Sequence, residues 1–328
     1  MLDKFFPLYA LIFFSTLAIT VAVERKVLPS LKRFAAQPIY EDGPAWHISK
    51  SGTPTMGGIA FLIATAFSLG IASIILLVVG EKDTALSLLI SLGYAVLNAL
   101  VGILDDLTKL KRKHNAGLTP RQKLVFQFAL AILFLYLRST IFGSTTELSF
   151  SFGKLDLGFF YYPISTVMLL GIVNCANLTD GIDGLASSVA FSIGAVLFFL
   201  SAALIPDSTI IASSVMGAAV GFLIFNLHPA KIFMGDTGSL FFGAILVSTA
   251  FSLENPLIFV FIGGIYVLEG LSVIIQVVFF KLTKKRIFKM APLHHHLEKS
   301  GFSENAICII AIILTFILSI PAFIFYLP

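Results

Sequence analysis

Long apolar runs separated by short polar segments are the dominant pattern along the chain. A helix needs roughly 20 apolar residues to cross a hydrocarbon core of about 30 Å. Ten runs approach this length, and they cover residues 5–23, 56–79, 85–104, 124–142, 157–173, 185–205, 210–227, 237–253, 257–280 and 306–327. The pattern therefore predicts an all-α integral membrane protein with about ten transmembrane helices.

A second pattern, in which polar and apolar residues alternate, occupies residues 145–160. The alternation surrounds Gly153 and Lys154, a pair suited to a tight turn, and predicts a small β-hairpin. The chain has no internal repeat of fixed period and no low-complexity linker. We therefore expect residues 1–328 to form a single polytopic membrane domain.

The composition supports the membrane assignment. Hydrophobic residues make up 57% of the 328 residues and charged residues 12%, with a mean hydropathy of +0.97. A soluble globule of this size would need more polar surface. The two cysteines, Cys175 and Cys308, make no disulfide framework, and no Cys/His spacing typical of structural zinc occurs.

The positive charges predict the orientation of the spans. Ten spans place five connections on one side, at residues 24–55, 105–123, 174–184, 228–236 and 281–305. These connections hold 18 of the 22 Lys and Arg residues, so we expect them to be cytoplasmic and both termini to be external. The first span is expected to be retained, because Arg25 and Lys26 follow its apolar run, whereas a cleaved signal peptide carries its charges first.

Histidines and aspartates gather in the same five connections. The histidines are His47, His114, His228, His294, His295 and His296. The aspartates at span ends are Asp105, Asp106, Asp180, Asp183 and Asp236. A single charged loop residue is usually only solvated, but Asp motifs at three different span ends indicate a site.

The stretch GILDDLTK (102–109) ends a span on two adjacent carboxylates. On a helix, Asn98, Gly102, Asp105 and Lys109 share one face, while Asp106 points about 100° away. We therefore expect different roles: one carboxylate faces a site between helices, and its neighbour holds a metal, a lysine or the loop. The alternative, charge anchoring at the interface, would be better served by Lys or Arg on an anionic inner leaflet.

The stretch NCANLTDGIDGLA (174–186) is rich in amide and carboxylate side chains. They are Asn174, Asn177, Asp180 and Asp183, with Gly181 and Gly184 between and after the aspartates. The glycines allow tight turns and the close approach of a ligand, and the following helix start favours an anion. An Asp/Asn-rich turn with a helix cap is the alternative.

Two further stretches carry polar residues before spans. In NLHPAKIFMGDTGSL (226–240), Asp236 is a hard oxygen donor, Thr237 and Ser239 can cap the next helix, and Phe233 beside Asn226 can stack on a nucleobase. In HISKSGTPTMGG (47–58), Lys50 and Thr55 are available to phosphate oxygens, although the order of a P-loop is absent.

Three consecutive histidines lie in KMAPLHHHLEKSG (289–301). An adjacent triple is weak evidence for zinc, whose ligands are usually spaced along a helix or across loops. Imidazoles at an anion site can donate hydrogen bonds to phosphate or exchange protons near neutral pH. We favour the second interpretation.

Carboxylates facing a phosphate ligand would repel it unless a divalent cation lay between them. Mg²⁺ uses one or two carboxylates together with substrate phosphates, which matches aspartates scattered over several motifs. The site lies at the level of lipid headgroups. A reaction between a lipid phosphate in the membrane and a soluble phosphate-bearing substrate fits that position.

Five motifs in order resemble the phospho-N-acetylmuramoyl-pentapeptide transferase family of the polyprenyl-phosphate N-acetylhexosamine-1-phosphate transferase superfamily. They are K-x-G-T-P-T-M-G-G (50–58), L-D-D (104–106), N-L-T-D-G-x-D-G-L-A (177–186), G-D-T-G-S (235–239) and P-L-H-H-H (292–296). The resemblance covers nearly the whole chain, and no motif position departs from it.

The resemblance implies a Mg²⁺-dependent transfer of phospho-MurNAc-pentapeptide from UDP-MurNAc-pentapeptide to undecaprenyl phosphate, giving lipid I and UMP for peptidoglycan biosynthesis. It also implies a homodimer in the bacterial cytoplasmic membrane, with the active site on the cytoplasmic face. Membrane lipid is an expected partner and nucleic acid is not.

By motif match, Asp236 would hold Mg²⁺, and Asp105, with Asp106 beside it, would act on the lipid phosphate as a base or by orienting it. His294 would act with them or contact phosphate. The residues expected to line the substrate site are Lys50, Thr55, Asn177, Asp180, Gly181, Asp183, Asn226, Phe233, His295 and His296. Whether an enzyme carboxylate or the lipid phosphate attacks first stays open.

Glu269 lies midway along the ninth run, and an acid inside a membrane is a functional candidate. Its neighbours Gly263, Gly264 and Gly270 would let that helix break and bring Glu269 toward the cytoplasmic site. The alternative is a buried carboxyl paired with a neighbouring helix.

Two other functions remain to be weighed. A sister transferase that uses UDP-N-acetylglucosamine shares the Asp-rich motifs, but by resemblance the histidine triple belongs to the muramoyl-pentapeptide branch. An ion-coupled transporter would place its coupling residues near the membrane midplane, whereas the aspartates here lie at span ends.

Overall fold

The computed structural model describes residues 5–35, 50–112, 117–143, 146–202 and 204–326. Within these ranges, nine helices are long and apolar enough to cross a membrane, and a shorter apolar helix lies at Leu185–Ser201. The prediction of an all-α multi-pass membrane protein is confirmed. His47 and His114, which the sequence places in cytoplasmic connections, lie outside the described residues.

The elements follow one another with short connections. The helices are α1 (Phe6–Phe34), α2 (Gly58–Val78), α3 (Lys82–Arg112), α4 (Pro120–Phe142), α5 (Tyr161–Thr179), α6 (Leu185–Ser201), α7 (Pro206–Asn226), α8 (Gly235–Thr249), α9 (Phe259–Ile262), α10 (Gly264–Thr283), α11 (Leu293–Glu298), α12 (Glu304–Leu318) and α13 (Ile320–Tyr326). Short 3-10 turns include η3 (Ala250–Leu253), which extends α8.

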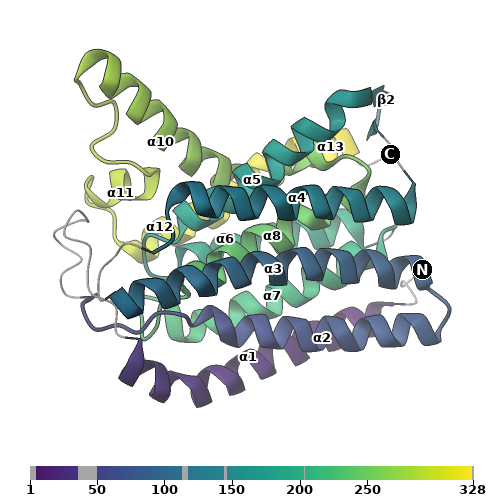
Figure 1. The fold of residues 1–328 in the computed structure, drawn as a ribbon, viewed down its shortest axis with the longest axis horizontal. Helices are drawn as coiled ribbons and strands as arrows, with labels where there is room; N and C mark the ends of the chain where they lie inside the picture. Colours follow the sequence, from purple (N-terminus) through teal and green to yellow (C-terminus); the bar gives the residue numbers. More distant parts are fainter. Residues whose placement is uncertain (1–4, 36–49, 113–116, 144–145, 203, 327–328) are drawn as a thin grey trace.

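The long helices lie side by side as one bundle (Figure 1). The beginning of α1, the helix α13 and the hairpin lie at one end of this bundle. The C-terminal end of α3 and the short helix α11 lie at the other end. This arrangement agrees with the expectation that both termini share one side and the Asp-rich motifs the other.

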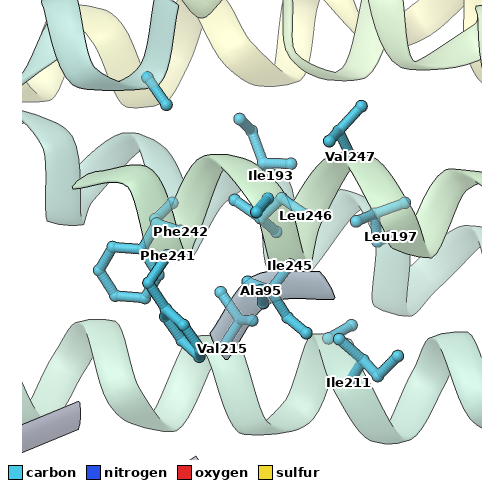
Figure 2. Packing of buried hydrophobic residues seen from close by; sticks show 14 of the residues in the cluster. Ala95, Ile193, Leu197, Ile211, Val215, Phe241, Phe242, Ile245, Leu246 and Val247 are labelled. Atoms are coloured by element: carbon cyan, nitrogen blue, oxygen red, sulfur yellow. The ribbon is translucent and has the colours of Figure 1, made fainter. Parts of the chain in front are cut away.

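Helix α8 is the central element of the bundle. In the apolar stretch that α8 and η3 form, 89% of the residues are buried. Figure 2 shows its side chains between those of α6 and α7, and the residues labelled on these three helices are Ile193, Leu197, Ile211, Val215, Phe241, Phe242, Ile245, Leu246 and Val247. Lipid tails are as apolar as these side chains, so close packing holds the helices together. This packing fixes the position of α8 and, with it, the position of the residues in its first turn.

A glycine sets the distance between α3 and α8. A Cβ atom on Gly102 would lie 2.4 Å from the carbonyl oxygen of Asp236, closer than two such atoms can approach. Small residues let helix backbones approach in this way. The close crossing brings Asp105 and Asp106 of α3 to the first turn of α8.

The predicted hairpin is present. Strand β1 (Glu147–Phe150) pairs antiparallel with β2 (Gly153–Asp156). The turn between them holds the end of the chain, because the Ser151 N–H donates to the Phe325 carbonyl at 2.7 Å. The hairpin thus holds α13 at the same end of the bundle as the beginning of α1 (Figure 1).

Several helices run further than the apolar runs predict. Helix α1 continues to Phe34, α3 to Arg112 and α5 to Thr179, so residues expected in connections are helical. The predicted connection at residues 105–123 thus begins too early, and Asp105 and Asp106 lie on α3, as the helical face that Asp105 shares with Lys109 assumed. Hydropathy detects the part of a helix in hydrocarbon, and the helix continues where polar side chains find partners.

The ninth span breaks at one of the glycines where the sequence allowed a break or a bend. Helix α9 ends at Ile262 and α10 begins at Gly264, with Gly263 between them. Beyond the break, α10 diverges from the bundle (Figure 1). Glu269 lies in the second turn of α10 and is 5% exposed.

Replacing Gly102 should disturb the crossing of α3 and α8. In Gly102→Leu the side chain meets the backbone of Asp236, and overpacking of this kind costs about 1–3 kcal/mol. We expect a lower melting temperature of the purified protein in detergent. Gly93→Ala on the same helix is the matched control, because a Cβ there meets nothing within 4 Å; equal melting temperatures of both variants would contradict the prediction.

Candidate functional site

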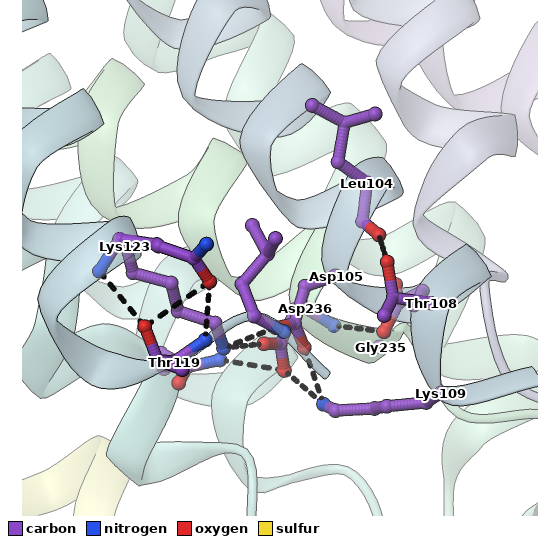
Figure 3. A network of polar contacts seen from close by, with 12 residues as sticks. Leu104, Asp105, Thr108, Lys109, Thr119, Lys123, Gly235 and Asp236 are labelled. Carbon is purple, nitrogen blue, oxygen red and sulfur yellow. Dashed lines mark hydrogen bonds and ion pairs between the residues drawn. The ribbon is translucent and has the colours of Figure 1, made fainter. Parts of the chain in front are cut away.

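Three carboxylates from two helices meet at one end of the bundle. Asp105 and Asp106 of α3 and Asp236 of α8 each place an oxygen within 4.8 Å of the others. Asp105 and Asp106 are buried, and Asp236 is partly buried. Figure 3 shows Asp105 and Asp236 side by side. The arrangement can offer hard oxygen ligands to a divalent cation.

Two lysines lie against these carboxylates (Figure 3). Lys109 Nζ lies 2.7 Å from Asp105 Oδ2 and 3.3 Å from Asp236 Oδ1. Lys123 of α4 lies 3.1 Å from Asp105 Oδ1 and also contacts Asp236 Oδ2. Buried carboxylates need such partners, because taking a lone charge out of water is costly. The lysines therefore join α3, α4 and α8 around one polar centre.

Asp106 has a different set of partners. It accepts hydrogen bonds from the backbone N–H groups of Asp236 (3.2 Å) and Thr237 (3.0 Å) and from the Thr237 hydroxyl (2.7 Å). The first N–H groups of a helix have no partner within it. Asp106 thus caps α8 from another helix, and the two carboxylates of the pair differ, as their places on α3 predict.

The predicted caps of α8 act differently. The Thr237 hydroxyl donates to Asp106, and the Ser239 hydroxyl donates to the Gly235 carbonyl at 3.1 Å. The N-cap residue, Met234, makes no side-chain cap. Capping by Thr237 and Ser239, which the sequence left possible, does not occur, because Asp106 supplies a charged acceptor at the same place.

Asn177 reaches the same centre from α5. Its Nδ2 donates to Asp236 Oδ1 at 3.1 Å and to Ser239 Oγ at 2.8 Å. Asn174, one turn earlier, donates instead to Gln127 Oε1 of α4 at 2.8 Å. Asn177 therefore belongs to the carboxylate centre, and Asn174 joins α5 to α4.

Asp180 lies just after α5 and is partly buried. Burial, which disfavours the charged form, raises its pKa to about 8, and the negative charges of Asp236, Asp106 and Asp183 act in the same direction. Lys109 offsets part of this effect. The centre thus carries more negative charge than its lysines compensate, and it favours a further cation.

A second cluster surrounds Asp183. Its carboxylate lies 2.7 Å from Lys50 Nζ and 2.9 Å from His228 Nδ1, and it accepts the Ala230 N–H at 3.0 Å. Glu304 of α12 binds Lys50 at 2.7 Å and accepts the Asp183 N–H at 2.7 Å. Lys50, predicted to be available to phosphate, is thus held between two carboxylates.

Asn226 joins two loops. Its Oδ1 accepts the Gly184 N–H at 3.1 Å, and its Nδ2 donates to the Ile232 carbonyl at 2.9 Å. The turn before α6 was expected to offer free N–H groups to an anion. Two of these groups are already bonded, Gly184 to Asn226 and Asp183 to Glu304.

The stretch around Thr55 lies against the loop that precedes α8. The Phe233 N–H donates to the Pro54 carbonyl at 2.8 Å, and the Gly57 N–H donates to the Phe233 carbonyl at 2.9 Å. Thr55 is buried, and a Cβ on Gly235 would lie 2.8 Å from its hydroxyl oxygen. The first and fourth motifs therefore form one wall of the site.

His294 approaches the Asp-rich turn closely. It is 1% exposed, and a Cβ on Gly181 would lie 2.1 Å from its Nε2, so only glycine leaves room for the imidazole. Its Nδ1 lies 3.2 Å from Glu269 Oε2, although the angle does not make a hydrogen bond. Within the described ranges, neither ring nitrogen of His294 has a hydrogen-bond partner.

Glu269 holds the helix that carries His294. Its carboxylate accepts the N–H of Leu293 at 2.7 Å and that of His294 at 3.2 Å. Glu269 therefore caps α11. Its place combines the two interpretations that the sequence left open, because the acid pairs with a neighbouring element and also lies beside the candidate site.

The other two histidines bind nearer residues of their own segment. His295 Nδ1 lies 2.6 Å from Glu298 Oε2. His296 Nδ1 accepts the Lys289 N–H at 3.1 Å, and its ring packs edge-on against Phe288. Of the three histidines, His294 therefore lies at the Asp-rich turn, and His296 holds the loop that precedes α11.

Lys123 and Glu304 belong to the site, but the sequence interpretation did not single them out. Lys123 had a usable signal, since Lys123 and the fully buried Gln127 are polar residues four apart in an apolar helix and share one face. Glu304 resembles an ordinary acid in the first turn of a helix. Only its contacts with Lys50 and Asp183 distinguish it.

The chain matches two models of known families. A model described as glycosyl transferase family 4 matches residues 87–254, about half of the chain. A model described as phospho-N-acetylmuramoyl-pentapeptide-transferase signature 1 matches residues 50–62, the stretch that contains Lys50 and Thr55.

Several curated relatives are similar over most of their length. The chain is 45% identical to a protein of Halalkalibacterium halodurans over 87% of both chains. It is 41% identical to one of Clostridium kluyveri over 96% of this chain and 99% of the relative. It is 46% identical to one of Thermoanaerobacter pseudethanolicus over 85% and 86%, respectively. All three carry the name phospho-N-acetylmuramoyl-pentapeptide-transferase. Together with the bundle and its carboxylate centre, these likenesses show that the chain is an enzyme of the phospho-N-acetylmuramoyl-pentapeptide transferase family.

Proposed function

We propose that the enzyme transfers phospho-MurNAc-pentapeptide from UDP-MurNAc-pentapeptide to undecaprenyl phosphate. A new bond joins an oxygen of the lipid phosphate to the phosphorus of the sugar phosphate, and the bond to UMP breaks. The products are lipid I and UMP. The observation that carries the proposal is the meeting of Asp105, Asp106 and Asp236 at one end of an apolar bundle, where a lipid phosphate and a soluble nucleotide can both arrive.

The donor set fits Mg²⁺. Asp236 is the partly buried member of the three, so it is the carboxylate we assign to the ion. Carboxylate oxygens are the ligands this cation uses together with substrate phosphates, and Asp105, Asp106 and Asp236 lie together beside only two ammonium groups among the described residues. When bound, Mg²⁺ shields the phosphates from the carboxylates and stabilises the negative charge of the leaving UMP.

We assign Asp105 to the lipid phosphate. Its carboxylate is buried, accepts the Leu118 N–H at 2.7 Å and lies between the ammonium groups of Lys109 and Lys123. These contacts fix it as an acceptor that can orient the phosphate or take a proton. The lysines can donate to phosphate oxygens once substrate enters. Asp106 keeps the first turn of α8, and therefore Asp236, in place.

The Asp-rich turn and its neighbours are assigned to the nucleotide sugar. The residues proposed to line that site are Thr55, Asn177, Asp180, Gly181, Asp183, Phe233, His294 and His295. Lys50, Asn226 and His296 complete the predicted set, and each also holds a surrounding loop through its bonds to protein groups. His294, whose ring nitrogens lack hydrogen-bond partners within the described ranges, is the residue best suited to donate to phosphate or sugar.

The distribution of charge supports the orientation. The five connections predicted on the side of the Asp motifs hold 18 of the 22 Lys and Arg residues, so the positive-inside rule assigns the site to the cytoplasmic face of the bacterial plasma membrane. Cytoplasmic UDP-MurNAc-pentapeptide would reach that face. A homodimer is carried over from the family as part of the proposal.

A two-substrate assay tests the reaction. Purified protein with undecaprenyl phosphate and Mg²⁺ should release UMP from UDP-MurNAc-pentapeptide and not from UDP-N-acetylglucosamine. Release from the second nucleotide alone would assign the chain to the sister reaction. Substrate flux into sealed vesicles with no UMP formed would favour a transporter instead.

Asp236→Asn should abolish most Mg²⁺-supported turnover. Loss of a charged metal ligand is worth several kcal/mol of transition-state stabilisation, so UMP release should fall at least about 100-fold. The variant should keep its melting temperature within a few degrees. Asp156→Asn in the exposed hairpin is the matched control and should retain full turnover. Turnover of Asp236→Asn near that of the control would remove Asp236 from the site.

Asp105→Asn should separate chemistry from nucleotide binding. The amide keeps the size of the side chain but removes the negative charge beside Lys109 and Lys123. We expect turnover to fall at least about 100-fold, while the dissociation constant for UDP-MurNAc-pentapeptide, measured by calorimetry, changes less than about threefold. Parallel loss of both quantities would place Asp105 in the nucleotide site.

A further inference from the structure

A polar cavity of about 340 Å³ lies at the end of the bundle opposite the carboxylate centre. Its walls come from the first turn of α3, the last turns of α4, the beginnings of α5 and α7, and η3. Arg138 lines this cavity together with the acidic residues Asp83, Asp207, Glu147 and Glu254. The reaction assigned above uses none of these residues.

Arg138 is fixed within this cavity. Its guanidinium donates to the Phe251 carbonyl at 3.0 Å and to the Ser87 hydroxyl at 3.3 Å, and it lies over the Phe142 ring. The Ser87 hydroxyl in turn donates to Asp207 at 2.5 Å. Arg has five N–H donors, so the contacts of this guanidinium leave donor capacity for an anion.

An apolar groove lies on α3 and α4, two of the helices that also line the cavity. It has a volume of about 200 Å³ and lies between α3 and α4, lined by residues that include Leu86, Gly93, Leu130 and Leu137. Leu86 lies three residues after Asp83 on the same helix face, and Arg138 lies four residues after the groove residue Phe134. The groove therefore continues the cavity along the bundle.

We propose that the cavity and groove together bind a phospholipid whose headgroup carries a primary amine. The groove matches an acyl chain in shape and chemistry. The phosphate would meet Arg138, and the ammonium group would meet the surrounding carboxylates. Tyr161 and Tyr162 also line the cavity, and tyrosines gather at the water interfaces of membrane proteins.

The balance of charge selects the headgroup. Lys154 pairs with Glu147 at 3.2 Å, so among the lining residues that the structure describes, the carboxylates of Asp83, Asp207 and Glu254 outnumber the one guanidinium. An anionic headgroup such as phosphatidylglycerol would bring phosphate without the amine and would meet this excess of negative charge. A headgroup with both charges satisfies Arg138 and the carboxylates at once.

Lipid titrations of the delipidated full-length protein in detergent, followed by native mass spectrometry, test the proposal. Dioleoyl phosphatidylethanolamine should bind at least about tenfold more tightly than dioleoyl phosphatidylglycerol, as expected for a charge-assisted contact. Arg138→Gln should weaken phosphatidylethanolamine binding by a similar factor. Equal affinity for the two lipids would overturn the proposed role of the amine.

Gly93→Leu tests the groove without disturbing the fold. Gly93 lines the groove, and a Cβ there meets nothing within 4 Å, so a leucine at this position would extend into the groove from an unobstructed start. Phosphatidylethanolamine binding should weaken about tenfold or more, with an unchanged melting temperature. Gly70→Leu on α2 is the matched control, since a Cβ there also meets nothing within 4 Å.

Unchanged lipid binding in Gly93→Leu would overturn the groove as the site. The unchanged protein could instead carry a bound peptide and no lipid, with the peptide lost in Gly93→Leu. That result would assign the groove to a membrane peptide and would equally overturn the proposal. Neither outcome depends on the transferase assay, so the lipid site and the proposed reaction fail separately.

Discussion

The hydrogen bonds from the first turn of α8 to Asp106 are the interaction on which the site depends. They satisfy N–H groups that a helix start cannot satisfy by itself. They also place Asp236 next to Asp105, because Asp106 and Asp105 are adjacent on α3. Gly102 allows the two backbones to come this close. A cap and a close crossing thus build a centre that neither helix could build alone.

The same device recurs at the two other parts of the site. Glu269 of α10 accepts the first N–H groups of α11 and holds His294. Glu304 of α12 accepts the Asp183 N–H and holds the Asp-rich turn. In each case a buried or partly buried carboxylate bonds to the backbone of a distant segment. Apolar contacts hold the bundle together but do not fix where its polar groups lie. These few directional hydrogen bonds fix those positions.

Repulsion between the carboxylates limits how close the three aspartates of the centre can lie. Asp105, Asp106 and Asp236 lie within a few ångströms, where like charges in a poorly solvated region repel strongly. Lys109 and Lys123 offset this repulsion from two different helices, so the centre assembles when α3, α4 and α8 meet. The remaining negative charge makes the centre receptive to a cation and, through it, to phosphate.

The sequence by itself determined the membrane-spanning bundle and the hairpin, because hydropathy and alternation act locally. It also located the motifs that meet at the site. Tertiary structure decided the partners: that Asp106 caps α8, that Lys50 is held between Asp183 and Glu304, and that α3 stays helical past Asp105. These contacts join residues far apart in the chain, and no local pattern encodes which distant carboxylate meets which amide.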